Sequence, residues 1–249
     1  MVDSLVNSDR LRTNPEPTGD ALVEPVSARR RMSVADRERH IVDGAICFFA
    51  EHGLDAQMRE LAAATGVTHT LVYHYFPTKQ ALVDRVYLEV FEGRWKQEWE
   101  VLLDDRKLSV EDKLTRFYID YARTVLTREF VRILIFSGLT DRSITDRFFG
   151  LLATRLFPRL VRETRRFRGS RSRARTTVRE HELLMGLHGG VFYGGLRWFV
   201  YGQAVHNERP ALDDEAVISD RVRSYLAASE VLEPAGTRPA PGTRKRNPL

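Results

Sequence analysis

Apolar residues recur with a helical period along most of the chain, and no segment shows the sustained two-residue alternation that is typical of a half-buried strand. Three short apolar stripes near the N-terminus predict three short helices, over residues 41–53, 58–66 and 68–76. Pro77 ends the third stripe, and Thr78 can cap a longer helix that continues to Trp95. The pattern therefore predicts an all-α fold that begins with three small helices.

Longer apolar stripes follow and predict further helices over residues 109–125, 129–139, 143–167, 179–202 and 214–228. Pro158 predicts a kink or break in the helix that contains it. The run 165–179 is rich in arginine and has no apolar face, so it is predicted to form a loop.

The apolar run 183–202 is about long enough to span a bilayer. It contains His188 and Arg197, however, and an arginine inside a membrane span costs roughly 2.5–3.5 kcal/mol. We therefore expect a buried helix of a soluble protein and no membrane partner.

The two ends of the chain, residues 1–32 and 232–249, are polar, contain proline and show no hydrophobic period. Such segments are predicted to be a disordered arm and a disordered tail. Between them the pattern predicts a helix-turn-helix domain over 33–79 and a larger helical domain over 80–231.

Two short helices joined by a turn that contains glycine, and supported by a preceding helix, describe a helix-turn-helix. Gly66 permits a left-handed backbone at the turn, and Ala62 is small where the two helices approach. The side chains predicted to point into the small core are those of Val67, Val72 and Phe76.

The opposite face of the third helix is rich in hydrogen-bonding and aromatic side chains and has no carboxylate; it comprises His69, Thr70, Tyr73 and His74. A recognition helix places its N-terminal residues at base edges, so His69 and Thr70 are the candidates for base contacts. The candidates for phosphate contacts are Tyr73, Tyr75 and Lys79, together with the free backbone amides at Thr68. For Tyr73 and His74 the alternative is a structural role on a short surface helix.

Fixed spacings over about fifty residues resemble the TetR-type family of bacterial repressors. The matching segments are residues 38–41 (ERHI), 45–49 (AICFF), 53 (G), 59–62 (RELA), 66–68 (GVT) and 72–82 (VYHYFPTKQAL). The resemblance implies three small DNA-binding helices followed by a helical domain for ligand sensing and dimerisation. It also implies DNA contacts for Thr68, His69, Thr70, Tyr73, Tyr75 and Lys79.

Three positions depart from the family pattern. Gln57 stands where the family usually has a capping threonine that also touches phosphate; because glutamine caps poorly, Asp55 is expected to cap instead and the second helix to begin early. Gly44 replaces a usual alanine, at a local cost of about 1 kcal/mol. Leu71 replaces a short polar residue, and it either meets a thymine methyl group or packs inward.

Aromatic residues are frequent in the larger domain, and most of them are expected to be ordinary core. A subset can line a pocket for a small apolar or aromatic effector, as small-molecule sites are built from apolar walls with a few polar groups. The candidates are Trp99, Phe117, Tyr121, Ser137, Phe149, His188 and Phe192. For His188 the alternative is a satisfied histidine of the core.

Gly186, Gly190 and Gly194 recur every four residues on one face of the predicted helix 179–202. Glycine weakens a helix, so a face of small residues indicates the close approach of another helix. We predict a homodimer interface on this face, to which the last helix contributes Val222, Tyr225 and Leu226. A tight crossing within the chain, or room for a ligand, are the alternatives.

The composition is ordinary for a globular protein of 249 residues, with 43% hydrophobic and 29% charged residues, and the net charge of +5 is compatible with a polyanionic partner. Cys47 is the only cysteine, so neither an intrachain disulfide nor a cysteine-based zinc site is possible, and a reducing cytoplasm fits. His181 and Glu182 begin a zinc-protease-like motif, but Met185 stands where its second histidine is required. Phosphate-loop and nucleophile-elbow motifs do not occur either, so no enzyme, metal or cofactor is expected.

The predicted function is that of a cytoplasmic transcriptional regulator that binds a palindromic operator of double-stranded DNA as a homodimer and responds to a ligand, most simply as a repressor. The alternative from another class is a nonspecific nucleic-acid or RNA-binding protein that works through the arginines of residues 162–179. That run lies between predicted helices and is expected to stay solvated.

Overall fold

The computed structural model describes residues 32–203 and 212–232 of the chain, so the predicted disorder of both ends lies almost wholly outside it. Within these residues the structure is helical and contains no strand, which confirms the predicted all-α fold. The small N-terminal helices are α1 (Val34–His52), α2 (Met58–Ala64), α3 (His69–Tyr75) and α4 (Lys79–Val90). The larger body contains α5 (Gln97–Asp104), α6 (Val110–Val125), α7 (Arg128–Leu139), α8 (Ser143–Leu151), α9 (Phe157–Phe167), α10 (Val178–Phe199) and α11 (Glu215–Ser229).

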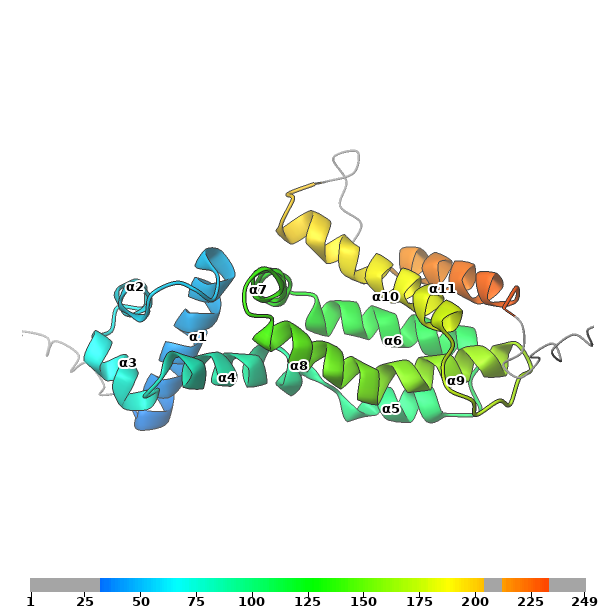
Figure 1. Cartoon of the computed structure of the whole chain (residues 1–249), viewed down its shortest axis with the longest axis horizontal. Coiled ribbons are helices and arrows are strands. Elements are labelled where there is room, and N and C mark those ends of the chain that lie inside the picture. The colour runs from blue at the N-terminus through cyan, green and yellow to red at the C-terminus, as the bar shows by residue number, and fades with distance from the viewer. Residues whose placement is uncertain (1–31, 204–211, 233–249) are drawn as a thin grey trace, which may run out of the picture.

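The helices form an elongated molecule with α1, α2 and α3 at one end (Figure 1). Helix α4 leads from this small domain into the larger body. Helix α7 packs against α1 on one side and against α8 and α10 on the other. Helix α11 packs on α6 and α10. The N-terminal helices therefore contact the body directly as well as through α4.

Side chains at the helix starts explain where the N-terminal helices begin. Ser33, Thr68 and Thr78 each accept a hydrogen bond from a backbone N–H three residues further on, at 3.0, 3.2 and 3.0 Å respectively. Such caps satisfy amides that have no partner within the helix. The caps predicted at Thr68 and Thr78 are confirmed.

Helix α4 is shorter than the sequence predicted: it ends at Val90, whereas the predicted helix continued to Trp95. A short 3₁₀ turn, Glu92–Arg94, follows it. A Cβ atom on Gly93 would lie only 2.6 Å from the carbonyl oxygen of Leu88, so this tight turn requires glycine. The apolar period continues across the turn, which is why the pattern alone did not reveal the break.

The helix predicted over 143–167 is interrupted as Pro158 implied. A π-helical turn, Leu152–Leu156, joins α8 to α9, and Pro158 lies in the first turn of α9. Proline has no N–H to donate to the preceding turn, so the hydrogen-bond ladder is rearranged there. Helix α9 then continues to Phe167 and so includes the first three residues of the run predicted as a loop.

Buried apolar side chains form one continuous cluster from α1 to α11. No helix among residues 32–203 and 212–232 is long and apolar enough to cross a membrane. The apolar helix α10 instead buries one face, including Leu184, Leu187 and Val191, against this cluster.

Candidate nucleic-acid interface and effector core

The turn between α2 and α3 has the geometry of a helix-turn-helix. Gly66 has a φ of +68°, a left-handed backbone that glycine adopts without strain. The N–H of Val67 donates to the carbonyl of Ala62 at 3.0 Å and closes the turn. Val72 and Phe76 are buried and Val67 is half-buried, as predicted, so α3 is held against α1 and α2 by its inner face.

The outer face of α3 is exposed and carries the predicted DNA-contacting side chains. The exposed positions are Gln57, Thr68, His69, Thr70, Tyr73 and His74. Tyr75 and Lys79 are half-buried at the end of α3 and the start of α4. The ring centres of His69 and Tyr73 lie 4.7 Å apart in an edge-to-face arrangement, so the two side chains pack against each other on the exposed face of α3. Leu71 is half-buried against the core, which favours packing over a base contact.

Gln57 occupies the N-cap position of α2, and its own N–H donates to the carboxylate of Glu60 at 3.4 Å. The expectation that Asp55 caps an earlier start is therefore wrong. The Glu60 carboxylate thus satisfies the N–H of the N-cap residue, which is one half of a capping box. The side chain of Gln57 is exposed at the start of α2.

Two contacts of the turn with α1 were missed by sequence reasoning. Nε2 of His40 donates to the carbonyl of Thr65 at 3.0 Å. Gly44 lies under the Thr65 side chain, where any Cβ atom would overlap its methyl group. The hydroxyl of Thr65 donates to the carbonyls of Leu61 and Ala62, at 2.9 and 3.1 Å, so this side chain is held in place.

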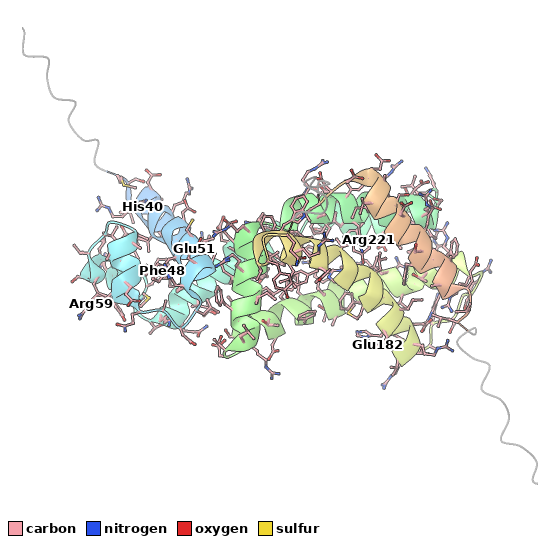
Figure 2. The ribbon with its side chains drawn as sticks, turned by 90° about the horizontal axis from the view of Figure 1, so that it is seen from above. His40, Phe48, Glu51, Arg59, Glu182 and Arg221 are labelled. Carbon is pink, nitrogen blue, oxygen red and sulfur yellow. The ribbon has the colours of Figure 1, made fainter. Side chains whose placement is uncertain are left out.

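Arg132 of α7 joins the small domain to the body. Its Nε donates to the carbonyl of Ala50 in the last turn of α1, and its Nη1 donates to the carbonyl of Phe199 at the end of α10, at 3.4 Å. Glu51 pairs with both Arg128 and Arg132. Figure 2 shows Glu51 at the end of α1 that meets the body, whereas His40 lies toward the other end of that helix. One guanidinium thus contacts the ends of two helices that belong to different parts of the molecule.

A second connection runs from α8 to α4. Nη1 of Arg147 lies 2.7 Å from a carboxylate oxygen of Asp84, and its guanidinium carbon lies 3.7 Å from the ring centre of Tyr87. The small domain is therefore joined to the body by charged contacts on α1 and on α4.

The centre of the body holds a cluster of aromatic side chains, which we call the aromatic core; it consists of Trp99, Phe117, Tyr118, Tyr121, Phe157 and His188. The imidazole of His188 lies 5.3 Å from the ring of Tyr121 and 6.0 Å from the ring of Tyr118. Trp99 donates its Nε1–H to Asp120 at 2.7 Å and is satisfied. Four of the predicted pocket residues meet here: Trp99, Phe117, Tyr121 and His188. Tyr118 was not among the predicted pocket residues, because the helical period indicates only that it is buried.

Three buried polar atoms of the aromatic core have no hydrogen-bond partner among the described residues: both tyrosine hydroxyls and Nδ1 of His188. A buried polar group without a partner costs about 1–3 kcal/mol. Burial lowers the pKa of His188 to about 4, and it raises the pKa values of Tyr118 and Tyr121. All three groups are therefore neutral at pH 7.

The remaining pocket candidates lie elsewhere. The Ser137 hydroxyl accepts the N–H groups of Ile144 and Thr145, at 3.1 and 3.3 Å, and so caps the start of α8 from α7. Phe149 is 45% exposed on the surface of α8. Phe192 is half-buried on α10 and packs against the core cluster.

Two of the three glycines on one face of α10 make room for side chains of the same chain. A Cβ atom on Gly190 would lie 2.8 Å from the guanidinium of Arg221, and one on Gly194 would lie 3.1 Å from Leu212, whereas Gly186 faces open space. Val222, Tyr225 and Leu226 of α11 are buried in the core of their own chain and have little surface left for a second copy.

These features together describe a helix-turn-helix domain joined to a larger helical domain that has an aromatic interior. Residues 41–86 match the family of bacterial regulatory proteins described as the tetR family. The segment that contains α3 thus carries the pattern of the tetR family of bacterial regulatory proteins.

Solved structures share the overall fold. A TetR-like transcriptional regulator from Rhodococcus sp. RHA1 has a TM-score of 0.55 and 20% identity, over 79% of this chain and 99% of that one. The fatty acid degradation regulator FadR from Bacillus halodurans has a TM-score of 0.54 and 17% identity, over 76% and 97%. A tetR-family regulator from Streptomyces coelicolor has a TM-score of 0.51 and 16% identity, over 80% and 83%. No curated protein matches the sequence.

Proposed function

We propose that the protein is a ligand-responsive repressor that binds a palindromic operator as a homodimer. The observation that carries this proposal is the outer face of α3, which is exposed, rich in hydrogen-bonding groups and free of carboxylates on a helix braced by a buried inner face. A face of this kind suits the major groove, where recognition helices read base edges.

His69 and Thr70 stand at the start of α3 and are assigned to base edges. Tyr73, Tyr75 and Lys79, with the amides at Thr68 and the side chain of Gln57, are assigned to phosphates. His74 is exposed on the same helix, and its ring lies 5.4 Å from that of Tyr75. Base contacts specify the sequence, whereas phosphate contacts fix the register.

A homodimer would place two copies of α3 in successive major grooves, about 34–36 Å apart. The part of α10 left open in one chain supports a two-fold contact there: Gly186 faces open space, and Tyr193 is 49% exposed on the same helix. Val217 of α11 is also exposed. Val222, Tyr225 and Leu226 support that surface from beneath.

Selection of bound duplexes from a random pool tests the DNA-binding proposal. The wild-type protein is expected to enrich a palindrome with half-sites one helical turn apart. His69→Ala and Thr70→Ala should relax the choice at defined base pairs and weaken binding by about 1–3 kcal/mol for each bidentate base pairing that the substitution removes. His181→Ala, on the exposed start of α10, is the matched control. Unchanged base preference in both α3 variants would contradict the assignment.

The aromatic core supports an effector site in the larger domain. Its three buried polar atoms without partners can donate or accept hydrogen bonds, and the side chains around them are aromatic. Because the histidine and both phenols are neutral, the aromatic core offers no counter-charge to an anion. We therefore assign to it an uncharged, ring-containing molecule that carries a hydroxyl or carbonyl group.

Thermal stabilisation and release of the selected operator test this assignment. A panel of neutral aromatic alcohols and ketones is compared with fatty acids, because FadR from Bacillus halodurans shares the fold. Neutral compounds are expected to stabilise the protein and release DNA, and Tyr118→Phe and Tyr121→Phe should weaken both effects. Tyr201→Phe, exposed just beyond the end of α10, is the control. A response to fatty acids alone, or one that both core variants retain in full, would contradict the proposal.

A further inference from the structure

The loop between α9 and α10, residues 168–177, lies at the end of the molecule opposite to α3 (Figure 1). Its sequence alternates arginine with small residues and contains no acidic residue. We call the exposed arginines of this segment and of the first turn of α10 the arginine loop; they are Arg171, Arg173, Arg175 and Arg179.

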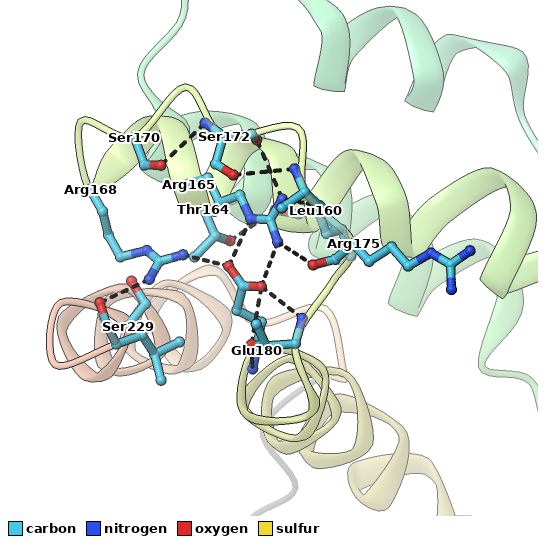
Figure 3. Close-up of polar contacts among 12 residues, drawn as sticks. Leu160, Thr164, Arg165, Arg168, Ser170, Ser172, Arg175, Glu180 and Ser229 are labelled. Carbon is cyan, nitrogen blue, oxygen red and sulfur yellow. Dashed lines mark hydrogen bonds and ion pairs between the residues drawn. The ribbon is translucent and has the colours of Figure 1, made fainter. Parts of the chain in front are cut away.

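A buried guanidinium holds the backbone of this loop. Arg165 of α9 donates to both carboxylate oxygens of Glu180, at 2.7 and 2.6 Å. It also donates to three carbonyl groups of the loop, those of Ser172 at 3.3 Å, Ala174 at 2.7 Å and Arg175 at 3.1 Å. Figure 3 shows these carbonyls converging on Arg165, while the side chain of Arg175 points away from the network.

Glu180, the acidic residue that follows the loop, has both carboxylate oxygens engaged in hydrogen bonds within the protein. Glu180 accepts from Arg165, from Arg168 at 2.7 Å and from the N–H of Thr177 at 3.0 Å. Hydrogen bonds from Arg165 above all, helped by the Thr177 N–H and by Arg168, lower the pKa of Glu180 to about 2. Its charge is therefore permanent at neutral pH and is directed into the protein, away from the exposed arginines.

The arginines of the π-helical turn and of α9 differ in this respect from those of the arginine loop. Arg155 and Arg159 pair with Glu100 of α5, and Arg162 pairs with Asp104. None of the four arginines of the arginine loop forms an ion pair with a described residue. Since the carbonyls turn inward to Arg165, the side chains between them are presented to solvent without partners.

We infer that the arginine loop is a second nucleic-acid contact, which binds phosphates of double-stranded DNA without reading its sequence. Arginines two residues apart in extended chain are separated by about 6.6 Å, so they can follow a row of phosphates. A guanidinium also pairs with phosphate through two parallel hydrogen bonds.

The residues between the arginines favour duplex DNA over other polyanions. The residues between these four arginines are Ser172, Ala174, Thr176, Thr177 and Val178, so there is no aromatic ring among them on which the bases of a single strand stack. Val178 is exposed and is the one apolar side chain larger than alanine among residues 171–179, whereas protein interfaces and membrane-binding segments use larger anchors such as tryptophan. The contact goes beyond the operator-binding proposal, because its place opposite α3 suits a second duplex.

Binding of a labelled duplex of random sequence, measured by anisotropy over a salt series, tests the inference. The variant Arg171→Ser/Arg173→Ser/Arg175→Ser is made in a background whose α3 carries His69→Ala and Thr70→Ala. We expect at least a tenfold loss of affinity at low salt and a salt-dependence slope reduced by about 2.7, since each phosphate contact contributes about 0.9. The charge-matched control is Arg116→Ser/Arg142→Ser/Arg223→Ser, whose residues lie on α6, at the N-cap of α8 and on α11.

A bridging assay separates this inference from the operator-binding proposal. Wild-type protein on its selected operator should retain a second, differently labelled random duplex, and the loop variant should keep the operator but release the second duplex. Equal salt slopes for the loop variant and the charge-matched control would overturn the inference. Equally tight binding of polyglutamate or of anionic vesicles by the arginine loop would also overturn it, because the commitment to duplex DNA would fail. Melting temperatures within the range of the control establish that the loop variant folds.

Discussion

Gly44 in the middle of α1 and Thr65 at the end of α2 are complementary in shape: the methyl group of Thr65 fills the space that a side chain on Gly44 would need. The departure from the family's usual alanine is therefore explained by a neighbour 21 residues away in the chain. The cost of glycine in a helix is offset by a close approach of the turn to α1.

Gly44→Ala is expected to destabilise the protein, because the overlap with Thr65 costs about 1–3 kcal/mol and outweighs a helix-propensity gain of about 1 kcal/mol. In a Thr65→Ser background, which lacks the methyl group but keeps the hydroxyl, the same change should cost less. Denaturant unfolding of the four proteins of this cycle gives the coupling. Gly150→Ala on α8, where a Cβ meets nothing, is the control and should stabilise. A cycle without coupling would show that the two residues are independent.

Arg132→Met is expected to loosen the end of α1, because the carbonyls of Ala50 and Phe199 lose a shared donor. Hydrogen exchange should accelerate in residues 49–53 and at the end of α10, and operator release by the effector should weaken. Arg128→Met removes only an exposed pair with Glu51, worth about 0–1 kcal/mol, and is the control. Equal exchange rates in the two variants would contradict a connecting role for Arg132.

Stability should fall as the pH drops from 6.5 to 4, because His188 has a pKa of about 4 in the folded chain and about 6.5 when unfolded. Because the pKa of His188 is lower in the folded chain, the unfolded state binds the proton more readily. The contribution of neutral His188 to stability is therefore complete above pH 6.5 and is lost as the pH falls toward 4. The loss attributable to this group is on the order of 3 kcal/mol. Unfolding of wild type and His188→Gln across this range measures it, and an identical slope in both proteins would refute it.

Glu180→Gln should cost about 3–5 kcal/mol, since it leaves the guanidiniums of Arg165 and Arg168 buried without a counter-charge. The loop that Arg165 holds should also become more sensitive to trypsin, with new cleavage after Arg171, Arg173 or Arg175. Glu182→Gln, two residues further along α10 and exposed, is the matched control. Trypsin resistance equal to that of the control would show that the ion pairs do not hold the loop.

Much of the proposed DNA-binding surface could be predicted from the sequence. The period of Val72 and Phe76 decides which face of α3 is buried, Thr68 caps the helix, and Gly66 permits the turn. These are local effects, each set by residues a few positions apart. They determine the outward direction of His69 and Thr70 before any tertiary contact is known.

The larger domain could be predicted less well, because a helical period shows that a residue is buried but not what covers it. Val222, Tyr225 and Leu226 have the pattern of an interface and lie in the core of their own chain. Ser137 has the pattern of a polar pocket residue and caps α8 across seven residues. Gly190 and Gly194 make room for Arg221 and Leu212 of the same chain.

The sequence by itself determined the helices, the turn and the face of α3, since caps, glycine and apolar period act over a few residues. Only the tertiary structure decided why Gly44 is glycine, which aromatic side chains surround His188, and how Arg165 turns the loop carbonyls inward. Each of those depends on side chains from separate helices meeting in a dense interior, where the shape and hydrogen bonding of one side chain determine the space and partners left for the next.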